Sequence, residues 1–336
     1  MRILVLGGTG WLGGEAADQA VAAGHDVTCA ARGSGVAAGA RHARVDRDDD
    51  TALTGLARER WDAVVDVARD PEHVRRAVRD LGPRSDRYLL VSTASVYASQ
   101  SELGADEDAP RLDPLPSGSV ARPEDYGAAK VACEDAVLDA LGTRSVVVRP
   151  GLIGGPGDTT GRTGWWPWRF ARPAGRATGD NRVLVPDAPD LPTAVLDVRD
   201  LAAWLLHLLG AGTTGVFDAA GQTLPLPQHL AAARDAARAA GGPAAHAAAA
   251  PQEWLTEHGV AAWAGLRSLP LWLPGRDLYG MSARSGARAL AAGLRRRPLA
   301  QTLHDTLAWE LGLPGHPHGA GLTDADERDL LAALDR

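Results

Sequence analysis

The 336-residue chain is predicted to be an α/β protein with a Rossmann-type, doubly wound parallel sheet and a smaller, mainly helical C-terminal substrate-binding region. Three observations predict this fold. Short apolar runs alternate with helical patterns through the first half of the chain, as in βαβ units. Most of the runs lack a polar–apolar alternation, which is typical of strands covered by helices on both faces. A glycine-rich turn also joins the first run to the first helical pattern.

The elements follow in order along the chain. The expected strands are rich in Val, Leu, Ile or Ala and span residues 3–6, 26–31, 43–45, 63–67, 88–92 and 145–149. The expected helices between them show helical apolar spacing and span residues 12–23, 50–60, 72–81 and 124–141. After residue 150 the pattern predicts a strand at 194–198, a helix at 200–209, a short strand at 216–217 and an Ala-rich, helical remainder. The low-complexity segment 241–250 fits either a helix or a surface loop.

These elements predict two regions. Residues 1–160 form an NADP-binding Rossmann domain, and residues 194–217 return to it. Residues 161–193 and 218–336 form the substrate-binding region.

Composition excludes several functional classes. The net charge of −7 argues against a nucleic-acid or anionic-membrane partner, since neither would be attracted to this surface. The two cysteines, Cys29 and Cys133, cannot form a disulfide framework and are expected to be core residues in a reducing compartment. No apolar run has the length of a membrane span, and the chain opens in a strand without a signal-peptide pattern. No spacing of His, Cys and Asp indicates a metal site. We therefore expect a soluble, cytoplasmic protein without a metal.

A dinucleotide site is predicted at the start of the chain. The predicted cofactor-binding loop follows the first strand and consists of Gly7, Gly8, Thr9, Gly10, Trp11, Leu12 and Gly13. Its glycines at positions 7, 10 and 13 permit a tight turn, a close backbone approach to a pyrophosphate and close packing of helix on strand. The helix N-terminus then presents N–H groups and a positive dipole end to the phosphates.

The end of the second strand favours NADP over NAD. Enzymes selective for NAD usually carry a carboxylate there for the ribose 2′-hydroxyl, but this chain has Arg32, whose guanidinium would pair with a 2′-phosphate. A solvated arginine is the alternative, so NAD(H) stays open as the cofactor. Asp46 is expected to meet the adenine amino group, although an N-cap role for an aspartate of this acidic run is equally consistent.

The predicted catalytic residues come from two segments. Tyr126 and Lys130 lie four residues apart on a helical pattern and therefore share a helix face. A free phenol has a pKa of about 10, and a nearby ammonium lowers it towards neutral pH. Lys130 is the only lysine among the 35 lysine and arginine residues, and a need for the compact, three-donor ammonium, which arginine lacks, would explain it. The carboxyl end of the fifth strand adds hydroxyl groups, with Thr93, Ser92 and Ser95 competing to bind a substrate carbonyl.

Together these segments resemble the extended and atypical short-chain dehydrogenase/reductases, the NAD-dependent epimerase/dehydratase family. The resemblance rests on the glycine loop, residues 92–97, Tyr126-x-x-x-Lys130 and residues 149–157, covers about the first 220 residues well and extends more loosely over the helical tail. It implies that Thr93 polarises the substrate, Tyr126 is the general acid/base and Lys130 tunes it and holds the ribose. The segment implied to lie against the nicotinamide consists of Pro150, Gly151, Leu152 and Ile153.

The chain also departs from the family. The His-x-Ala-Ala that follows the fourth strand is here Asp66-Val67-Ala68-Arg69, in which Ala68 is expected to contact the cofactor. Family dehydratases carry Asp-Glu after the threonine, and Ala94-Ser95 stand here, so 4,6-dehydratase chemistry is not expected.

The sequence leaves the substrate open. Trp165 and Trp166 fall in the predicted substrate-binding region and are expected either to contact substrate, with Ser95, or to pack at the junction between domains or at a dimer interface. The leading hypothesis is an NADP(H)-dependent reductase or dehydrogenase (EC 1.1.1 type) of a carbonyl or alcohol group in a small, partly apolar metabolite. The alternatives are a nucleotide-sugar epimerase of the same family and a non-catalytic NADP-binding sensor. A homodimer formed through the helices at 72–81 and 124–141 is an expectation at the level of the family.

Overall fold

The computed structural model describes residues 1–314 and 318–336 and divides them into two compact units. Unit 1 comprises Met1–Gly151, Val198–Ala220 and Arg284–Arg295, and unit 2 comprises Leu152–Asp197, Gly221–Ala283 and Arg296–Arg336. These bounds differ from the expected ones in three respects. The segment that returns to unit 1 spans residues 198–220, not 194–217. The chain passes to unit 2 after Gly151, not after residue 160, and residues 284–295 belong to unit 1 although the sequence analysis assigned them to the substrate-binding region.

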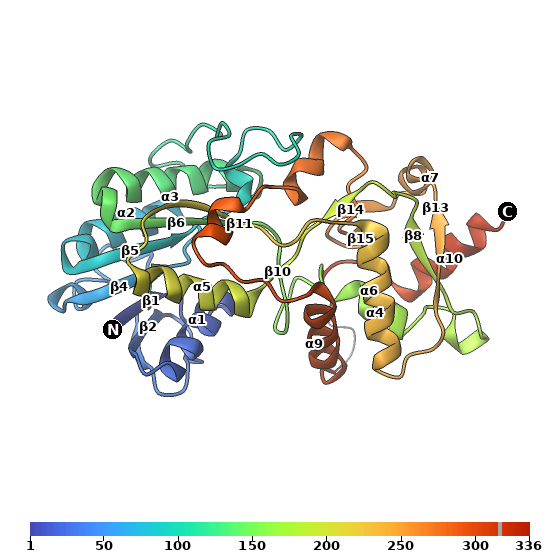
Figure 1. The fold of residues 1–336 in the computed structure, drawn as a ribbon, viewed down its shortest axis with the longest axis horizontal. Coiled ribbons are helices and arrows are strands. Elements are labelled where there is room, and N and C mark those ends of the chain that lie inside the picture. The colour runs from blue at the N-terminus through green and yellow to red at the C-terminus, as the bar shows by residue number, and fades with distance from the viewer. Residues whose placement is uncertain (315–317) are drawn as a thin grey trace. The chain divides into compact units, whose positions relative to one another are not determined.

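Unit 1 is built on a seven-stranded parallel sheet (Figure 1). Its strands are β1 (Arg2–Leu6), β2 (Asp26–Ala31), β3 (Arg41–Arg44), β4 (Trp61–Asp66), β5 (Ser85–Val91), β6 (Ser145–Pro150) and β11 (Gly215–Ala219). Their spatial order is β11-β6-β5-β4-β1-β2-β3, and each neighbouring pair is parallel. The central strands are buried on both faces, which explains their unbroken apolar sequences. The predicted doubly wound, Rossmann-type sheet is confirmed.

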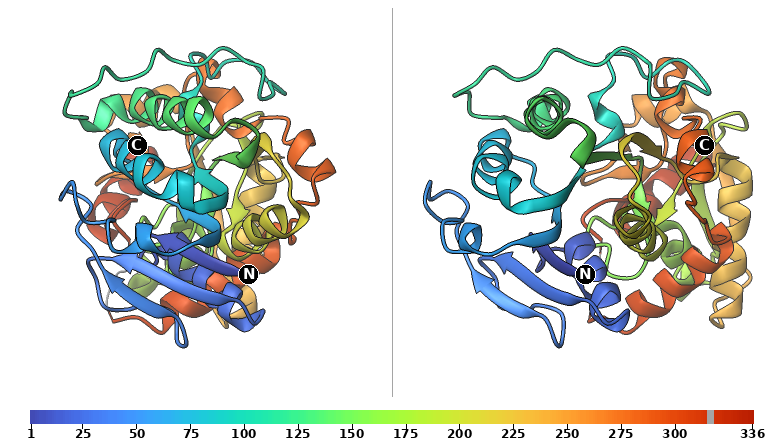
Figure 2. Two further views of the ribbon diagram at one scale, coloured as in Figure 1. Left: turned by 90° about the vertical axis from the view of Figure 1, so that its left-hand side faces the viewer. Right: turned by 60° about the vertical axis from the view of Figure 1, so that its left-hand side comes forward.

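Helices cover both faces of this sheet. The helices of unit 1 are α1 (Trp11–Ala22), α2 (Pro71–Leu81), α3 (Tyr126–Leu141), α5 (Val198–Ala211) and α8 (Ala287–Ala291). Helices α2 and α3 pack side by side on one face, and α1 packs against α5 on the other (Figures 1 and 2). Short 3-10 turns lie at Leu56–Arg58, Gly82–Arg84, Ala94–Val96, Pro123–Asp125 and Gly142–Arg144.

Unit 2 combines short strands with helices. Its strands form four pairs, which are β7 (Ile153–Gly154) with β10 (Leu196–Asp197), β8 (Arg182–Pro186) with β13 (His246–Ala250), β9 (Pro192–Thr193) with β12 (Leu224–Pro225), and β14 (Ala261–Trp263) with β15 (Ser268–Pro270). Its helices are α4 (Trp165–Ala171), α6 (Leu226–Ala239), α7 (Gln252–Glu257), α9 (Leu299–Leu311) and α10 (Asp324–Leu334), with 3-10 turns at Arg176–Thr178 and Arg276–Ser282. A core rich in tryptophan and leucine joins these elements.

Two local predictions are wrong. The helix expected at 50–60 is replaced by turns and the 3-10 turn Leu56–Arg58, because Asp49 accepts the Thr51 N–H at 2.8 Å in a local turn and Asp50 is bound by Arg79. The segment 241–250 is neither helix nor loop throughout, since its second half forms β13. Pairing with β8 in parallel overrides the helical preference of alanine there. No helix among the described residues has both the length and the apolar character needed to cross a membrane.

Candidate active site

The glycine loop is a tight turn between β1 and α1. Gly7 has φ = +95°, a conformation that favours glycine, and its carbonyl oxygen accepts the Gly10 N–H at 2.9 Å. A Cβ atom at Gly13 would lie 2.3 Å from the Gly7 oxygen, and one at Gly8 would lie 2.6 Å from Cys29 Sγ. The turn therefore depends on several positions without side chains.

The N-terminus of α1 fits a dinucleotide pyrophosphate. Gly10 is the N-cap residue and no side chain caps the first turn, which starts with Trp11 and Leu12. An uncapped helix N-terminus next to a backbone cradle that Cβ atoms would fill offers N–H donors and a positive dipole end to an anion. The residues present thus match the anionic part of a nicotinamide dinucleotide.

The end of β2 lies beside this loop. A Cβ atom at Gly33 would meet Thr9 Oγ1 at 3.2 Å, so the residues after β2 border the glycine turn. The preceding Arg32 has 73% of its side chain exposed, and its Nη1 lies 3.8 Å from Asp48 Oδ2. Asp48 comes from the acidic run after β3, and this contact with Arg32 was not predicted from the sequence.

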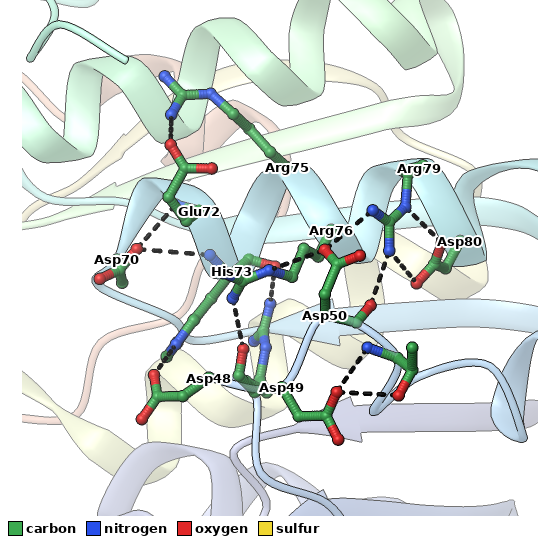
Figure 3. Close-up of polar contacts among 12 residues, drawn as sticks. Asp48, Asp49, Asp50, Asp70, Glu72, His73, Arg75, Arg76, Arg79 and Asp80 are labelled. Carbon is green, nitrogen blue, oxygen red and sulfur yellow. Dashed lines mark hydrogen bonds and ion pairs between the residues drawn. The ribbon is translucent and has the colours of Figure 1, made fainter. Parts of the chain in front are cut away.

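Asp48 belongs to a charged cluster between this acidic run and α2 (Figure 3). His73 Nε2 lies 2.7 Å from Asp48 Oδ1, and this hydrogen bond, followed by the charges of His73, Arg32 and Arg76, lowers the pKa of Asp48. Asp46 is exposed and accepts the Asp48 N–H at 3.2 Å in a local turn. The next helical element is the 3-10 turn Leu56–Arg58, whose N-cap residue is Gly55, so the alternative that an aspartate of this acidic run is an N-cap residue is wrong.

The buried end of β4 carries an ion pair that sequence analysis missed. Asp66 is fully buried and receives both terminal nitrogens of Arg47, at 2.6 and 2.9 Å, and the Tyr88 hydroxyl at 2.6 Å. Its Oδ1 also accepts the Ala68 N–H at 2.9 Å. The only signal in the sequence was the departure from the family's histidine at this position.

Lys130 lies at the carboxyl edge of β4 and β5. Its Nζ donates to the carbonyl oxygens of Ala68 at 2.7 Å and Val91 at 2.6 Å, and the residue is 1% exposed. Burial lowers the pKa of Lys130, while nearby Asp66 and Glu134 act in the opposite direction. The ammonium is thus held by carbonyl oxygens, without a carboxylate hydrogen bond among the described residues.

Tyr126 is the first residue of α3 and is 37% exposed. The helix start packs directly on the segment after β5, since a Cβ atom at Gly127 would lie 2.3 Å from the Ser95 carbonyl oxygen. In that segment Thr93 Oγ1 accepts the Ser95 N–H and donates its own hydroxyl proton to Ser95 Oγ, each at 3.2 Å. Two segments 30 residues apart in sequence therefore bring a phenol, an ammonium and two hydroxyl groups to one edge of the sheet.

A second unpredicted network lies beneath these residues. Glu134, one helical turn beyond Lys130, is fully buried and accepts hydrogen bonds from Ser92 Oγ at 2.5 Å and from Arg149 at 2.7 and 2.9 Å. The half-exposed Arg111 adds a contact at 3.0 Å. Both carboxylate oxygens of Glu134 therefore accept hydrogen bonds.

The network continues to the edge strand β11. Arg149 donates to the Tyr97 hydroxyl at 2.8 Å, and that hydroxyl donates to Asp218 at 2.6 Å. Arg284 closes the network, since its Nε donates to Asp218 at 2.7 Å and its guanidinium lies 3.4 Å from the centre of the Tyr97 ring. Burial, together with the charge of Asp218, raises the pKa of Tyr97. Tyr97 is therefore a structural residue, unlike the partly exposed Tyr126.

The segment expected against the nicotinamide is divided between the two units. Pro150 ends β6 and the Gly151 N–H donates to Ala219 O at 3.1 Å, both within unit 1. Leu152 and Ile153 begin unit 2, where Ile153 lies in β7.

The two tryptophans expected as substrate contacts are core residues of unit 2. Trp165 and Trp166 are each 0% exposed, and their rings pack edge to face at 4.6 Å. Trp166 Nε1 donates to Pro270 O at 2.8 Å. Substrate contact is therefore replaced by packing at these two positions, because no surface of either ring is open. No group of three or more His, Cys, Asp or Glu side chains in the described part of the chain could hold a metal ion.

The family model for the NAD dependent epimerase/dehydratase family matches residues 3–217, which include both segments of the site. The chain belongs to this family. No curated protein sequence matches the chain significantly.

Solved structures share the fold over nearly the whole chain. A putative epimerase from Burkholderia cenocepacia J2315 is 24% identical with a TM-score of 0.66, covering 91% of this chain and 97% of its own. The UDP-N-acetylglucosamine 4-epimerase from Bacillus cereus is 16% identical with a TM-score of 0.64, covering 94% and 99%. The Bordetella bronchiseptica enzyme WbmG, solved with NAD and UDP, is 19% identical with a TM-score of 0.65, covering 92% and 94%. At these identities the similarity establishes the fold.

Proposed function

We propose that the chain is an NADP(H)-dependent oxidoreductase of a carbonyl or alcohol group in a small, partly apolar metabolite. The observation that carries the proposal is the packing of the α3 start on the segment after β5, which gathers Tyr126, Lys130 and Thr93 at the carboxyl edge of the sheet. Ligands of open α/β sheets bind at this edge.

The cofactor assignment draws on three features. The glycine loop and the uncapped start of α1 suit the pyrophosphate. Arg32 follows β2, is largely exposed and has a weak contact with Asp48, so its guanidinium is available to a 2′-phosphate. When bound, the nicotinamide would accept or supply the hydride, and Lys130, Ala68 and Pro150 would border its ribose and ring.

The chain's own residues would handle the proton. Thr93 Oγ1, with Ser95, would donate a hydrogen bond to the substrate oxygen, and the Tyr126 hydroxyl would give or take the proton on that oxygen. Lys130 follows Tyr126 by four residues on the same face of α3, and its Nζ is held by two backbone carbonyl oxygens, so it would be in place beside the phenol and the cofactor ribose.

A nucleotide-sugar epimerase is the second candidate. The specific observation in its favour is that WbmG, of the same fold, was solved with NAD and UDP, and that other structures of this fold are UDP-sugar epimerases. In such an enzyme Tyr126 and Thr93 would have the same roles, while the sugar is transiently oxidised by the bound cofactor. A non-catalytic sensor role is less well supported, because Tyr126 and Lys130 are both present.

Calorimetry of NADP and NAD binding to the wild-type chain and to Arg32→Ala tests the cofactor assignment. We expect NADP to bind at least tenfold more tightly than NAD, and Arg32→Ala to remove that preference because a charge-assisted contact is lost. Equal affinities, unchanged by the substitution, would overturn the NADP assignment.

A turnover assay separates the functional candidates. NADPH oxidation is followed with an aliphatic aldehyde, a benzaldehyde and a cyclic ketone, and UDP-glucose and UDP-N-acetylglucosamine are tested for epimerisation. Reduction of a carbonyl probe that Tyr126→Phe lowers at least 100-fold supports the oxidoreductase. Conversion of a UDP-sugar with retained cofactor would favour the epimerase, and turnover of neither class, with intact NADP binding, would favour the sensor.

A further inference from the structure

The departure from the family motif after β4 coincides with the ion pair between Asp66 and Arg47. We propose that Asp66 is a positioning residue for the Tyr126–Lys130 pair, because it binds the N–H of Ala68, the residue whose carbonyl oxygen receives the Lys130 ammonium. This inference rests on the proposed function only in assigning Lys130 to the active site.

The hydrogen bonds form a continuous path. Asp66 Oδ1 accepts the Ala68 N–H at 2.9 Å, and Ala68 O accepts Lys130 Nζ at 2.7 Å. The backbone of the single residue Ala68 therefore links a buried carboxylate to the buried ammonium. The other Lys130 contact is to Val91 O at 2.6 Å, at the end of the adjacent strand β5.

Asp66 is itself held on several sides. Arg47 binds both carboxylate oxygens and also donates to His73 O at 2.5 Å, while Arg76 donates to Arg47 O at 2.6 Å. Tyr88 adds its hydroxyl from β5. Burial alone would raise the pKa of Asp66, but Arg47, Tyr88 and the Ala68 N–H together hold that pKa below its usual value. Asp66 is therefore a fixed negative charge at neutral pH.

Few other ionisable groups act on the Lys130 ammonium. The groups that act on it are Asp66 from β4, Arg69 from the following loop, and Cys133 and Glu134 from its own helix. Burial raises the pKa of the Cys133 thiol to about 12, so Cys133 is neutral at physiological pH. Glu134 is engaged by Ser92 and Arg149. Asp66 is thus the carboxylate whose hydrogen-bonded path ends on the ammonium.

Lys130 is the only lysine of the chain, which makes the test direct. Lysine labelled with 13C at Cε gives one side-chain signal, and its titration reports the ammonium without substrate or cofactor. We expect Asp66→Asn to shift the titration midpoint down, because a negative charge is removed and Arg47 is left uncompensated. We expect Arg47→Gln to shift it up, because Arg47 then no longer neutralises the charge of Asp66, which favours the ammonium form of Lys130.

The opposite directions distinguish positioning from general damage, since a loss of structure would move both variants the same way. Asp70→Asn is the matched control. It makes the same chemical change four residues further along the chain, at the N-cap of α2, where Asp70 accepts the Glu72 N–H at 2.7 Å and asparagine caps about as well. It should leave both the titration midpoint of Lys130 and the stability of the chain close to those of the wild type.

Binding of NADPH, followed by its fluorescence, is the second readout. We expect Asp66→Asn to raise the dissociation constant about tenfold, as for the loss of one hydrogen bond to a charged group. Two folded variants with an unchanged midpoint, or with shifts in the same direction, would overturn the proposal even if the cofactor binds. If Arg47→Gln does not fold, the direction observed in Asp66→Asn decides, because a loss of structure would raise the midpoint that burial lowers. Loss of NADP binding by the wild-type chain would instead overturn the proposed function and leave the lysine titration interpretable.

Discussion

Ser92 Oγ donates a 2.5 Å hydrogen bond to Glu134, and both side chains are buried. This contact joins the residue before Thr93 to the helix that carries Tyr126 and Lys130. It is one of four hydrogen bonds that saturate the Glu134 carboxylate.

Glu134→Gln is therefore expected to destabilise the chain by roughly 3–5 kcal/mol, because Arg149 is left as a buried charge without its partner. Urea denaturation followed by tryptophan fluorescence measures the change. Asp135→Asn is the matched control on the same helix, since Asp135 is partly exposed and contacts only Arg111, at 2.9 Å, among the network residues. It should cost less than about 1 kcal/mol. Equal losses in the two variants would contradict the importance of the buried network.

Adjacent glycines of α1 are expected to respond in opposite ways to alanine. Gly13→Ala places Cβ 2.3 Å from Gly7 O, so the turn must shift, and we expect a loss of about 1–3 kcal/mol together with at least tenfold weaker dinucleotide binding. At Gly14 the added Cβ would lie 3.6 Å from Gly8 O, an ordinary contact, and alanine should stabilise the helix by up to about 1 kcal/mol. Thermal denaturation and calorimetric titration with NADP measure both effects. Similar dinucleotide binding by the two variants would argue against the glycine loop as the cofactor cradle.

A pH-dependent stability is expected from unit 2. Burial, with a contribution from Asp158, raises the pKa of Glu310 to about 8, against an ordinary value of 4.5. The folded chain then retains a proton that the unfolded chain has released, so the free energy of unfolding falls as pH rises from 4.5 towards 8. Burial lowers the pKa of His318, whose Nε2 lies 2.9 Å from Glu310 Oε1, to about 4. The contribution of His318 to stability therefore rises with pH only up to about pH 6.5, the ordinary pKa of histidine. Burial also raises the pKa of Glu327, to about 7. Between pH 7 and pH 8 the change in the free energy of unfolding is therefore expected to come mainly from Glu310.

Across that window the free energy of unfolding should fall by about 1 kcal/mol, since one proton corresponds to ~1.4 kcal/mol per pH unit. Denaturation at pH 7 and pH 8 measures the slope, and Glu310→Gln should flatten it. Glu257→Gln, at an exposed position of α7, serves as the control and should retain the slope. A slope that persists in Glu310→Gln would rule out this residue as its source.

Trp166→Phe tests the packing role of the buried tryptophans. Loss of the indole N–H leaves Pro270 O without that donor and removes ring volume from a fully buried site, so we expect a loss of roughly 2–4 kcal/mol. Trp254→Phe is the control, because Trp254 is only half-buried and stacks on His258 at 3.8 Å. Thermal and urea denaturation compare the two, and an unchanged stability in Trp166→Phe would contradict the core assignment.

Several features of the fold follow from local sequence patterns. The buried strands, the glycine turn and the spacing of Tyr126 and Lys130 depend on residues within one or two turns of each other, and periodicity and glycine content report such relations directly. The wrongly predicted helix at 50–60 also has a local cause. The aspartates of that run bind backbone and arginine groups, which competes with helix formation.

By itself, therefore, the sequence determined the parallel sheet, the position of the glycine loop and the segments that end at the carboxyl edge. Tertiary structure alone decided which buried charges meet there, since the partners are far apart along the chain. Arg47 reaches Asp66 over 19 residues, Ser92 reaches Glu134 over 42 and Tyr97 reaches Asp218 over 121. The physical reason is that a charge is stable in the interior only when the strand order brings a partner to it, and no local pattern encodes that order.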